Sequence, residues 1–268
     1  MSMNDLAVLI PAYNDNNALT VTLDSIKEEN YDFIVLIIDD GSPEPIFVEH
    51  NRYPFDVEVI RLDNNLGITG ALNTGLRYLS QKENIHFIAR LDCGDLNAEN
   101  RFSIQRKLLI ENDDLMLVGS NVEFFDTNNI DNNFYTSLPI KNDEIKKNVW
   151  LKNCFVHPAV IFRKVIFNQV GYYDPQAKYI EDYVLFSKII NMAKTENIPN
   201  YLVRCEIRTS GISVKREREQ AISGLKWKLQ AREFKNIYWC FSIIKSIVRV
   251  ILRRRMMNKL KKIMRIIK

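Results

Sequence analysis

The chain has 268 residues, of which 46% are apolar and 26% charged, so it can bury the core of one large domain, or of a domain with an appendage. Its net charge of +4 is unevenly spread: residues 241–268 hold ten Lys and Arg and no acid, and subtracting these ten leaves −6 on residues 1–240. No uncharged run approaches the roughly 20 residues of a membrane-spanning helix, and the four cysteines form no CxxC pair.

The first hundred residues alternate apolar strands with amphipathic helices. The run LAVLIPAYN at 6–14 predicts a strand that is buried on both faces. Helices are expected next at 16–26 and 67–81, and further strands at 33–42, 57–65 and 85–92. This alternation predicts right-handed crossovers and a largely parallel sheet flanked by helices, which is an α/β fold.

The second half of the chain is more mixed. The apolar spacing predicts helices at 101–112, 144–153 and 179–193, and strands at 115–126 and 159–167. A basic helix at 226–235 and a basic amphipathic helix at 238–268 follow. We therefore expect a main domain at 1–215, with halves at about 1–100 and 101–215, and a basic helical tail at 216–268.

Polar clusters follow three of the first four predicted strands. They are Pro11–Tyr13, Asp39–Ser42 and Asp92–Asp95. Ligands of such sheets bind at the carboxyl ends of the strands, where these clusters are expected to meet. The Asp39–Ser42 cluster either forms a turn that ends its strand or accepts hydrogen bonds from a base or ribose. Gly67 opens a helix whose N-terminus favours a diphosphate, although the GxGxxG spacing is missing.

The segment ARLDCGD places Asp92 and Asp95 three residues apart, directly after Arg90. Two carboxylates at a strand end repel each other unless a cation lies between them. A divalent ion with oxygen ligands satisfies that need and leaves an open side for substrate phosphates. The alternative is a surface turn in which Arg90 screens both acids.

Glu181 and Asp182 begin a predicted amphipathic helix. Acids in a first turn stabilise the helix dipole, which is the simpler interpretation. The functional alternative makes one of them a general base. His157, which precedes Pro158 before an apolar strand, is expected to be a structural hydrogen-bonding residue.

Taken in order, these segments resemble the family 2 glycosyltransferases, which have a GT-A fold, of the bacterial O-antigen and polysaccharide type. The resemblance covers roughly residues 5–195 and rests on the ordered set VLIPAYND, IIDDGS, NNLGITGALNTGL, IARLDCGD, CFVHPAVIFRK, GYYD and EDYVLFSKI. One departure stands out, because members commonly carry DxDD and this chain has Gly94 in place of the middle acid.

The resemblance implies a role for each matching residue. Asp182 would be the catalytic base and Glu181 its support, while Asp92 and Asp95 would hold Mn²⁺ or Mg²⁺. The residues implied to bind the nucleotide sugar are Pro11, Ala12, Tyr13, Asp39, Asp40, Gly67, Arg90 and Asp92. The implied reaction is an inverting transfer of a hexose, Glc or Gal, from a UDP-sugar to GlcNAc-diphospho-undecaprenol, through a β1,3 linkage, in O-antigen or capsule assembly.

The basic tail at 238–268 predicts a peripheral contact with an anionic membrane surface, with Trp239 at the interface. The alternative is a tail that packs on the core or pairs with the acidic body, and no nucleic-acid partner is expected, because nucleic acid is a poorer fit that would leave the apolar face unused. Scattered cysteines without a signal peptide predict a reducing compartment, here the cytoplasmic face of the bacterial inner membrane. Two other functions remain open, a nucleotidyltransferase and a membrane scaffold without catalysis, although the segment after the first strand lacks the lysines of a nucleotidyltransferase phosphate loop.

Overall fold

The computed structural model describes residues 5–29, 31–208, 216–234 and 236–251. The expected alternation is present in the first hundred residues, which form β1 (Leu6–Ala12), α1 (Asn16–Ser25), β2 (Ile34–Asp39), β3 (Asp56–Arg61), α2 (Gly67–Ser80) and β4 (Phe87–Arg90). The strands β1, β2, β3 and β4 pair in parallel, with β1 between β2 and β4. Their polar carboxyl ends therefore share one edge of the sheet.

The second half adds strands of both directions and most of the helices. Its elements are β5 (Leu96–Asn97), α3 (Arg101–Glu111), β6 (Leu115–Phe125), β7 (Phe134–Tyr135), α4 (Asn142–Asn148), β8 (Ile161–Arg163), α5 (Phe167–Val170), α6 (Glu181–Met192), β9 (Lys194–Glu206), α8 (Glu217–Ala231) and α9 (Ile237–Ile251). Short 3₁₀ turns cover His50–Arg52, Ile130–Asn132, His157–Ala159 and Lys164–Ile166.

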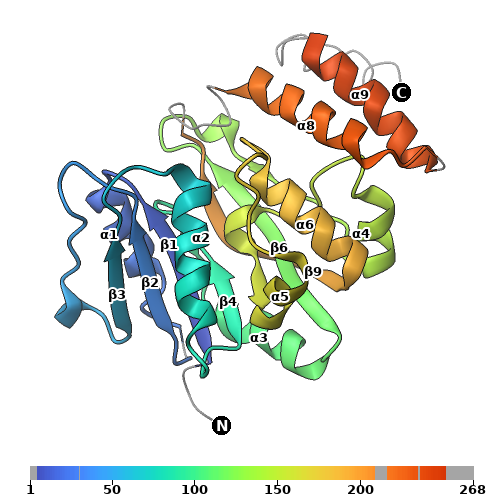
Figure 1. The fold of residues 1–268 in the computed structure, drawn as a ribbon. Helices are drawn as coiled ribbons and strands as arrows, with labels where there is room; N and C mark the ends of the chain where they lie inside the picture. Colours follow the sequence, from blue (N-terminus) through green and yellow to red (C-terminus); the bar gives the residue numbers. More distant parts are fainter. Residues whose placement is uncertain (1–4, 30, 209–215, 235, 252–268) are drawn as a thin grey trace.

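In the described part of the chain one nine-stranded sheet runs in the order β3-β2-β1-β4-β8-β6-β9-β5, with β7 beside β6. Strand β8 is antiparallel to both of its neighbours, whereas β6 and β9 are parallel. Helices α1 and α3 cover one face, and α2, α4 and α6 cover the other (Figure 1). Alternate residues of β1 enter the two cores, with Val8 on one side and Leu9 on the other, which explains its unbroken apolar run.

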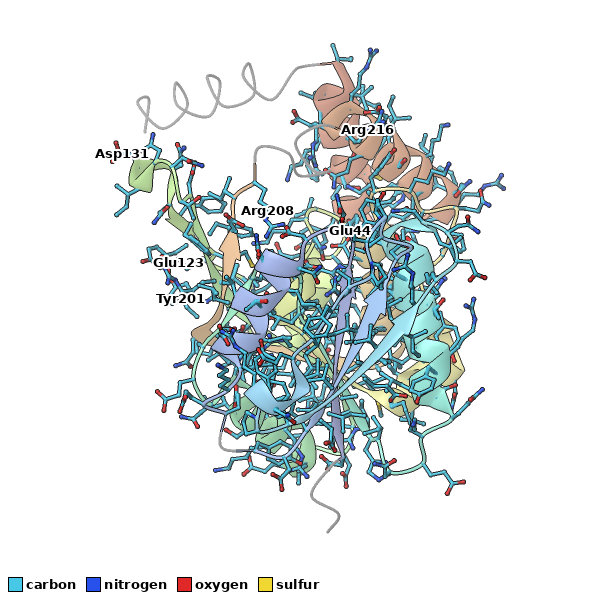
Figure 2. The ribbon with its side chains drawn as sticks, turned by 90° about the vertical axis from the view of Figure 1, so that its left-hand side faces the viewer. Glu44, Glu123, Asp131, Tyr201, Arg208 and Arg216 are labelled. Atoms are coloured by element: carbon cyan, nitrogen blue, oxygen red, sulfur yellow. The ribbon has the colours of Figure 1, made fainter. Side chains whose placement is uncertain are left out.

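Two parts of the sheet differ from the sequence prediction. Strand β9 was not expected, because Lys194–Glu206 mixes charged, polar and apolar residues without a clear period. It pairs with β6, and Figure 2 labels Glu123 of β6 and Tyr201 of β9 on the same side of the molecule, with Asp131 farther out. The expected strand at 159–167 is shorter, because 3₁₀ turns occupy both of its flanks.

The C-terminal helices α8 and α9 form a hairpin that packs against the main domain (Figure 1). Trp227 of α8 stacks on Trp150 with ring centroids 5.3 Å apart. Trp239, which we expected at a membrane interface, is instead buried, and its indole N–H donates to the carbonyl of Lys228 at 2.7 Å. This part of the tail therefore packs on the body, as the alternative interpretation proposed. Residues 252–268 and the expected domain boundary at 215 lie outside the described residues.

Among the described residues, no helix combines the length and the apolar character that crossing a bilayer requires.

Candidate active site

The three polar strand ends meet as expected. The backbone N–H of Asp40 donates to the carbonyl of Ala12 at 2.9 Å, and that of Asn14 donates to Ser42 Oγ at 2.9 Å, which joins the ends of β1 and β2. Thr22 Oγ1 accepts the N–H of Gly94 at 2.7 Å and so attaches α1 to the turn after β4. The edge of the sheet is thus held together by bonds between its own loops.

Asp39 and Asp40 support this edge from within. The Asp39 carboxylate accepts N–H groups from Ser42 at 2.9 Å and Ile46 at 3.2 Å, and Arg61 Nη1 lies 3.3 Å from it. Asp40 accepts the N–H of Leu66 at 2.7 Å and so fixes the segment that leads into α2. Neither residue lines the cavity described below. The turn interpretation of this cluster therefore accounts for the contacts that the structure gives these carboxylates.

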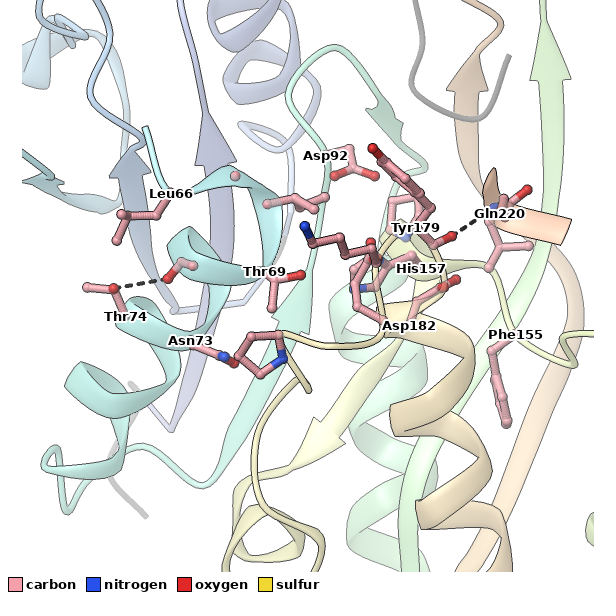
Figure 3. Close-up of a pocket in the computed structure, with 18 of the residues that line it drawn as sticks. Leu66, Thr69, Asn73, Thr74, Asp92, Phe155, His157, Tyr179, Asp182 and Gln220 are labelled. Atoms are coloured by element: carbon pink, nitrogen blue, oxygen red, sulfur yellow. Dashed lines mark hydrogen bonds between the residues drawn. The ribbon is translucent and has the colours of Figure 1, made fainter. Parts of the chain in front are cut away.

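A cavity of about 790 Å³ opens beside these strand ends. One side is formed by the beginning of α2, and the other by the loops that precede β8 and α6 (Figure 3). Asp92, Glu181 and Asp182 all line this cavity, as does Gly67. The acid after β4 and the acids that begin α6 therefore share one cleft, although 89 positions separate Asp92 from Glu181. The other residues of the ARLDCGD segment do not line the cavity.

Asp92 is held in the cavity by Arg90, whose guanidinium bonds both Asp92 Oδ1 and the carbonyl of Leu91. Arg90 is only 2% exposed and does not line the cavity, so its observed role is to position Asp92. The expected contact of Arg90 with the nucleotide sugar stays a prediction. Burial raises the pKa of Asp92, but the charge and hydrogen bond of Arg90, together with smaller effects of other nearby cations, outweigh it and the net shift is downward. Asp92 therefore presents a carboxylate to the cavity at neutral pH.

Asp95 is placed differently from the prediction. Its carboxylate turns away from the cavity and accepts the N–H of Glu206 in β9 at 3.0 Å. Burial and the charge of Asp92 raise the pKa of Asp95 to about 7. The side chain of Asp95 points away from the cavity because the chain turns at Gly94, whose φ is +98°. The pairing of Asp92 and Asp95 around a metal ion stays a prediction, although the side chain of Asp95 is engaged with β9, and the described residues contain no cluster of three or more His, Cys, Asp or Glu that could hold an ion.

Gly94 itself is packed under Arg208. A Cβ at this position would lie 1.7 Å from Arg208 Nη2, and Arg208 is held there by Asp15 at 3.1 Å and Glu206 at 2.6 Å. A residue with a Cβ at this position would therefore be strained by the backbone angle, and the Arg208 guanidinium would have to shift to make room for it.

Asp182 lies in the first turn of α6 and lines the cavity. Its Oδ2 accepts the side-chain N–H of Asn153 at 2.8 Å. Burial raises the pKa of Asp182 to about 6, against the opposing effect of hydrogen bonds from the helix start and Asn153. Burial and the charge of Asp182 likewise raise the pKa of Glu181 to about 7. A carboxylate with a pKa near neutrality can accept a proton and release it again, as a general base requires.

His157 also lines the cavity, which the sequence did not indicate. Its Nε2 lies 2.7 Å from the Tyr173 hydroxyl, in agreement with the expected structural hydrogen bond. Burial and the charge of Arg90 lower the pKa of His157 to about 3, so the imidazole is neutral at physiological pH. A neutral imidazole between Asp92 and Asp182 adds no charge to the cleft.

Several polar residues of the site were missed by sequence reasoning. Asn73 of α2 bonds both backbone groups of Tyr173, at 2.8 and 3.0 Å, and so fixes the loop before α6. Gln220 of α8 donates to the carbonyl of Tyr179 at 2.9 Å, which ties the hairpin to the same loop. Arg77 and Lys178 bring two cations to the cavity. These residues carry no local signal, because only the folded chain brings them to the strand ends.

Pro11, Ala12 and Tyr13 follow a different pattern. They lie at the end of β1, where Ala12 is buried and Tyr13 is exposed, and none of the three lines the cavity. Their predicted contact with a nucleotide remains a prediction.

Comparison with known proteins identifies the chain. Residues 7–171 match the model of glycosyl transferase family 2. An Escherichia coli protein, a UDP-Gal:α-D-GlcNAc-diphosphoundecaprenol β-1,3-galactosyltransferase, is 31% identical over 227 residues, which are 82% of this chain and 79% of the relative.

Two solved structures are similar in fold. Staphylococcus aureus TarS 1–349 in complex with UDP has a TM-score of 0.65 at 16% identity, over 94% of this chain and 73% of that one. The mannosyltransferase PcManGT of Pyrobaculum calidifontis, in complex with GDP-Man and Mn²⁺, has a TM-score of 0.63 at 14% identity, over 91% of this chain and 73% of that one. The chain, rather than a nucleotidyltransferase or a scaffold, is therefore a glycosyltransferase of family 2 with the GT-A fold.

Proposed function

We propose that the protein transfers a hexose, glucose or galactose, from a UDP-sugar to GlcNAc-diphospho-undecaprenol with inversion. The new bond is a β-linkage, β1,3 by analogy with the E. coli relative, and the product enters O-antigen or capsule repeat assembly. The observation that carries the proposal is the shared cavity of Asp92 and Asp182. It gives the departing diphosphate and the incoming hydroxyl separate acidic neighbours in one cleft.

In the proposed reaction Asp182 removes the proton from the acceptor hydroxyl, and that oxygen attacks the anomeric carbon as the bond to UDP breaks. Asn153 orients the Asp182 carboxylate, and the raised pKa matches the task of a general base. Arg77 and Lys178 stand in the cavity where the charge of the donor diphosphate needs neutralisation. At the beginning of α2, Ile68 and Thr69 offer backbone N–H groups to the same anion, whereas the N–H of Gly67 donates to Asn65 Oδ1 at 3.0 Å.

Of the two predicted metal ligands, Asp92 is the one that we propose to bind the divalent ion. A hard divalent cation is often bound by one or two carboxylates together with substrate phosphates, and Asp92 presents a partly exposed carboxylate to the cavity. When bound, Mn²⁺ or Mg²⁺ would neutralise charge on the leaving diphosphate. Asp95 has no part in this arrangement, because its side chain is engaged with β9.

The test is transfer from a panel of radiolabelled UDP-sugars to GlcNAc-diphospho-lipid, with the wild type and Asp182→Asn side by side. We expect one or two donors to be used, and Asp182→Asn to lose roughly 10²- to 10⁴-fold in turnover, the usual contribution of a general base. Binding of the UDP-sugar by the variant should persist. Full turnover by Asp182→Asn would exclude the proposed base, and absence of transfer to any lipid diphosphate would exclude the proposed acceptor.

We also propose that α9 lies on an anionic membrane surface, at the cytoplasmic face of the bacterial inner membrane. Its outer face is an exposed apolar stripe at helical spacing, made of Ile237, Phe241, Ile244, Val248 and Ile251. Lys245 and Arg249 flank it, and eight further cations follow in the sequence at 252–268. An amphipathic helix with this pattern binds the headgroup region, with about 1 kcal/mol per basic residue near the surface.

Sedimentation with vesicles tests this second part. The protein should sediment with phosphatidylglycerol vesicles and much less with phosphatidylcholine vesicles, and salt should release it. Replacing Phe241 and Ile244 together by Ser should weaken sedimentation while leaving transfer to a short-chain acceptor intact. Equal binding to both kinds of vesicle, or unchanged binding of the variant, would contradict the proposal.

A further inference from the structure

A second cavity, of about 170 Å³, lies between the beginning of α6 and the hairpin of α8 and α9. It shares Asp182 and Gln220 with the larger cavity, so the two spaces meet at the proposed base. Unlike the first cavity, it is lined by three cations, Lys152, Lys228 and Arg249. Of these three, the proposed function uses only Arg249, which flanks the apolar stripe of α9, and it gives none of them a part in the transfer reaction.

Lys228 is the unusual member of this group. It is only 6% exposed, its Nζ lies 3.2 Å from Ser246 Oγ, and the ring centroid of Tyr183 is 5.7 Å from it. Within the described ranges no carboxylate forms an ion pair with Lys228 or with Arg249. A hydroxyl and a ring face compensate poorly for the loss of water around an ammonium group, so burial of this side chain is costly without an anion.

The surroundings of Lys228 increase this cost. Burial first, and then the charges of Lys245 and Arg249, lower the pKa of Lys228 to about 8. The ammonium form still dominates at pH 7. The charges of Lys152, Lys228 and Arg249 around the small cavity repel one another in the free protein. An anion with two negative charges would remove that repulsion.

The cations are tied to the active site by a short chain of contacts. Arg249 Nη2 donates to Gln220 Oε1 at 3.4 Å, and Gln220 Nε2 donates to the carbonyl of Tyr179 at 2.9 Å. Tyr179 lines the larger cavity, close to Asp182 in the view of Figure 3. An anion at Lys228 and Arg249 would therefore lie in the small cavity that Asp182 lines, whereas Asp92 lines only the larger cavity.

The geometry points to a diphosphate subsite for the acceptor: we infer that Lys228, Arg249 and Lys152 bind the diphosphate that joins the acceptor sugar to its lipid. This inference rests on the proposed function and adds a subsite to it. A sugar linked to that diphosphate would extend toward Asp182, which is where its hydroxyl must react. The lipid chain would leave along α9, whose exposed apolar stripe lies on the opposite face of that helix from Ser246.

Lys228→Met tests the subsite, because methionine fills a similar volume without the charge. Lys226→Met is the matched control, since Lys226 is exposed on the same helix. The acceptors are a GlcNAc-diphospho-lipid with a chain too short to need a membrane, and a neutral alkyl GlcNAc of similar length. We expect Lys228→Met to raise the KM for the diphosphate acceptor roughly 10- to 100-fold, as the loss of a bond between charged groups does. The KM for UDP-sugar and the weaker use of the neutral acceptor should be unchanged.

Other results would overturn the inference in distinct ways. A raised KM for UDP-sugar would assign the cations to the donor, and a defect seen only with anionic vesicles would assign them to membrane lipid. An unchanged KM for the diphosphate acceptor would exclude the subsite. A lower melting temperature in Lys228→Met would show that the charge stabilises the hairpin, whereas we expect an equal or higher one.

Calorimetry separates this inference from the proposed function. With UDP saturating the larger cavity, inorganic pyrophosphate should bind the wild type and Lys226→Met but not Lys228→Met. If no lipid diphosphate accepts a sugar while this binding is seen, the proposed acceptor is wrong and the anion site stands. If transfer occurs and pyrophosphate binds all three proteins equally, the function stands and the subsite is wrong.

Discussion

Asp39 at the end of β2 is buried and Asp182 at the start of α6 is half-buried in the cavity wall, yet the loss of water has opposite net consequences for their pKa values. For Asp39 burial raises the pKa, but hydrogen bonds from Ser42 and Ile46 and the charge of Arg61 outweigh it and the pKa falls. For Asp182 burial wins and the pKa rises to about 6. Asp95, with a single backbone donor from Glu206, rises to about 7.

The difference shows how the protein divides its work. At the strand ends the loops donate enough hydrogen bonds to keep Asp39 charged, and the charge then fixes the loops. At α6 the hydrogen bonds to Asp182 do not offset its desolvation, and the charge of Asp92 adds to it, so Asp182 keeps an affinity for protons. The first region is a scaffold that is complete by itself, whereas the second, on our proposal, is completed by its substrates.

The largest effect should come from the one strand-end carboxylate that faces the cavity. Removing divalent ions with EDTA should reduce transfer on the order of 10²-fold or more, and Mn²⁺ or Mg²⁺ should restore it. Asp92→Asn should raise the Mn²⁺ concentration for half-activation at least tenfold. Asp95→Asn should change it little, because a pKa of about 7 means that the neutral form of Asp95 is already well populated. If both variants raised the Mn²⁺ concentration for half-activation equally, both aspartates would bind the ion. Full activity in EDTA would exclude a metal.

The pH dependence of kcat/KM comes next in size. A base must be deprotonated to act, and a raised pKa means that protonation begins at a higher pH than for an ordinary aspartate. We expect kcat/KM to fall about tenfold per pH unit below pH 6, where Asp182 gains its proton, and to be level between pH 7 and pH 8, above which Lys228, with a pKa of about 8, loses the charge proposed to bind the acceptor. Circular dichroism at pH 5 serves as the control for folding. A profile that stays level down to pH 5 would show that Asp182 is not the titrating base.

The sequence predicted the first region better than the second, for a physical reason. Strands β1 to β4 have short-range signals, namely apolar runs that end in turn residues, and their ends must meet once the sheet is parallel. Strand β9 has no such signal, because its place between β6 and β5 is set by pairing across the chain. The acids Asp92 and Asp182 were found from motif order, but the direction of Asp95 depends on one glycine angle and on a strand that was not predicted.

The polar residues around the acids could not be predicted at all. Asn153, Gln220 and Lys228 act through partners 29, 41 and 18 positions away. A basic helix predicts a surface, as it did here for the tail, and nothing in KWKLQAREFK distinguishes the buried Lys228 from the exposed Lys226. The helical period alone does not decide which of the two lysines is buried, because that depends on how the hairpin docks on the main domain.

The smallest effect concerns the stability of the scaffold. Gly94 and Gly171 both have a positive φ, +98° and +73°, but a Cβ meets Arg208 only at Gly94, while nothing lies within 4 Å at Gly171. Gly171→Ala should therefore destabilise the fold through its backbone conformation alone, φ +73° with ψ −168°, by about 1–3 kcal/mol. Gly94→Ala should cost more, because the Arg208 guanidinium must also leave Asp15 and Glu206. Urea unfolding of the two variants measures the difference, and the double variant with Arg208→Ala should reduce the cost at Gly94 to that at Gly171. If both glycines cost the same, Arg208 yields freely and the turn after Asp92 is held by backbone geometry alone.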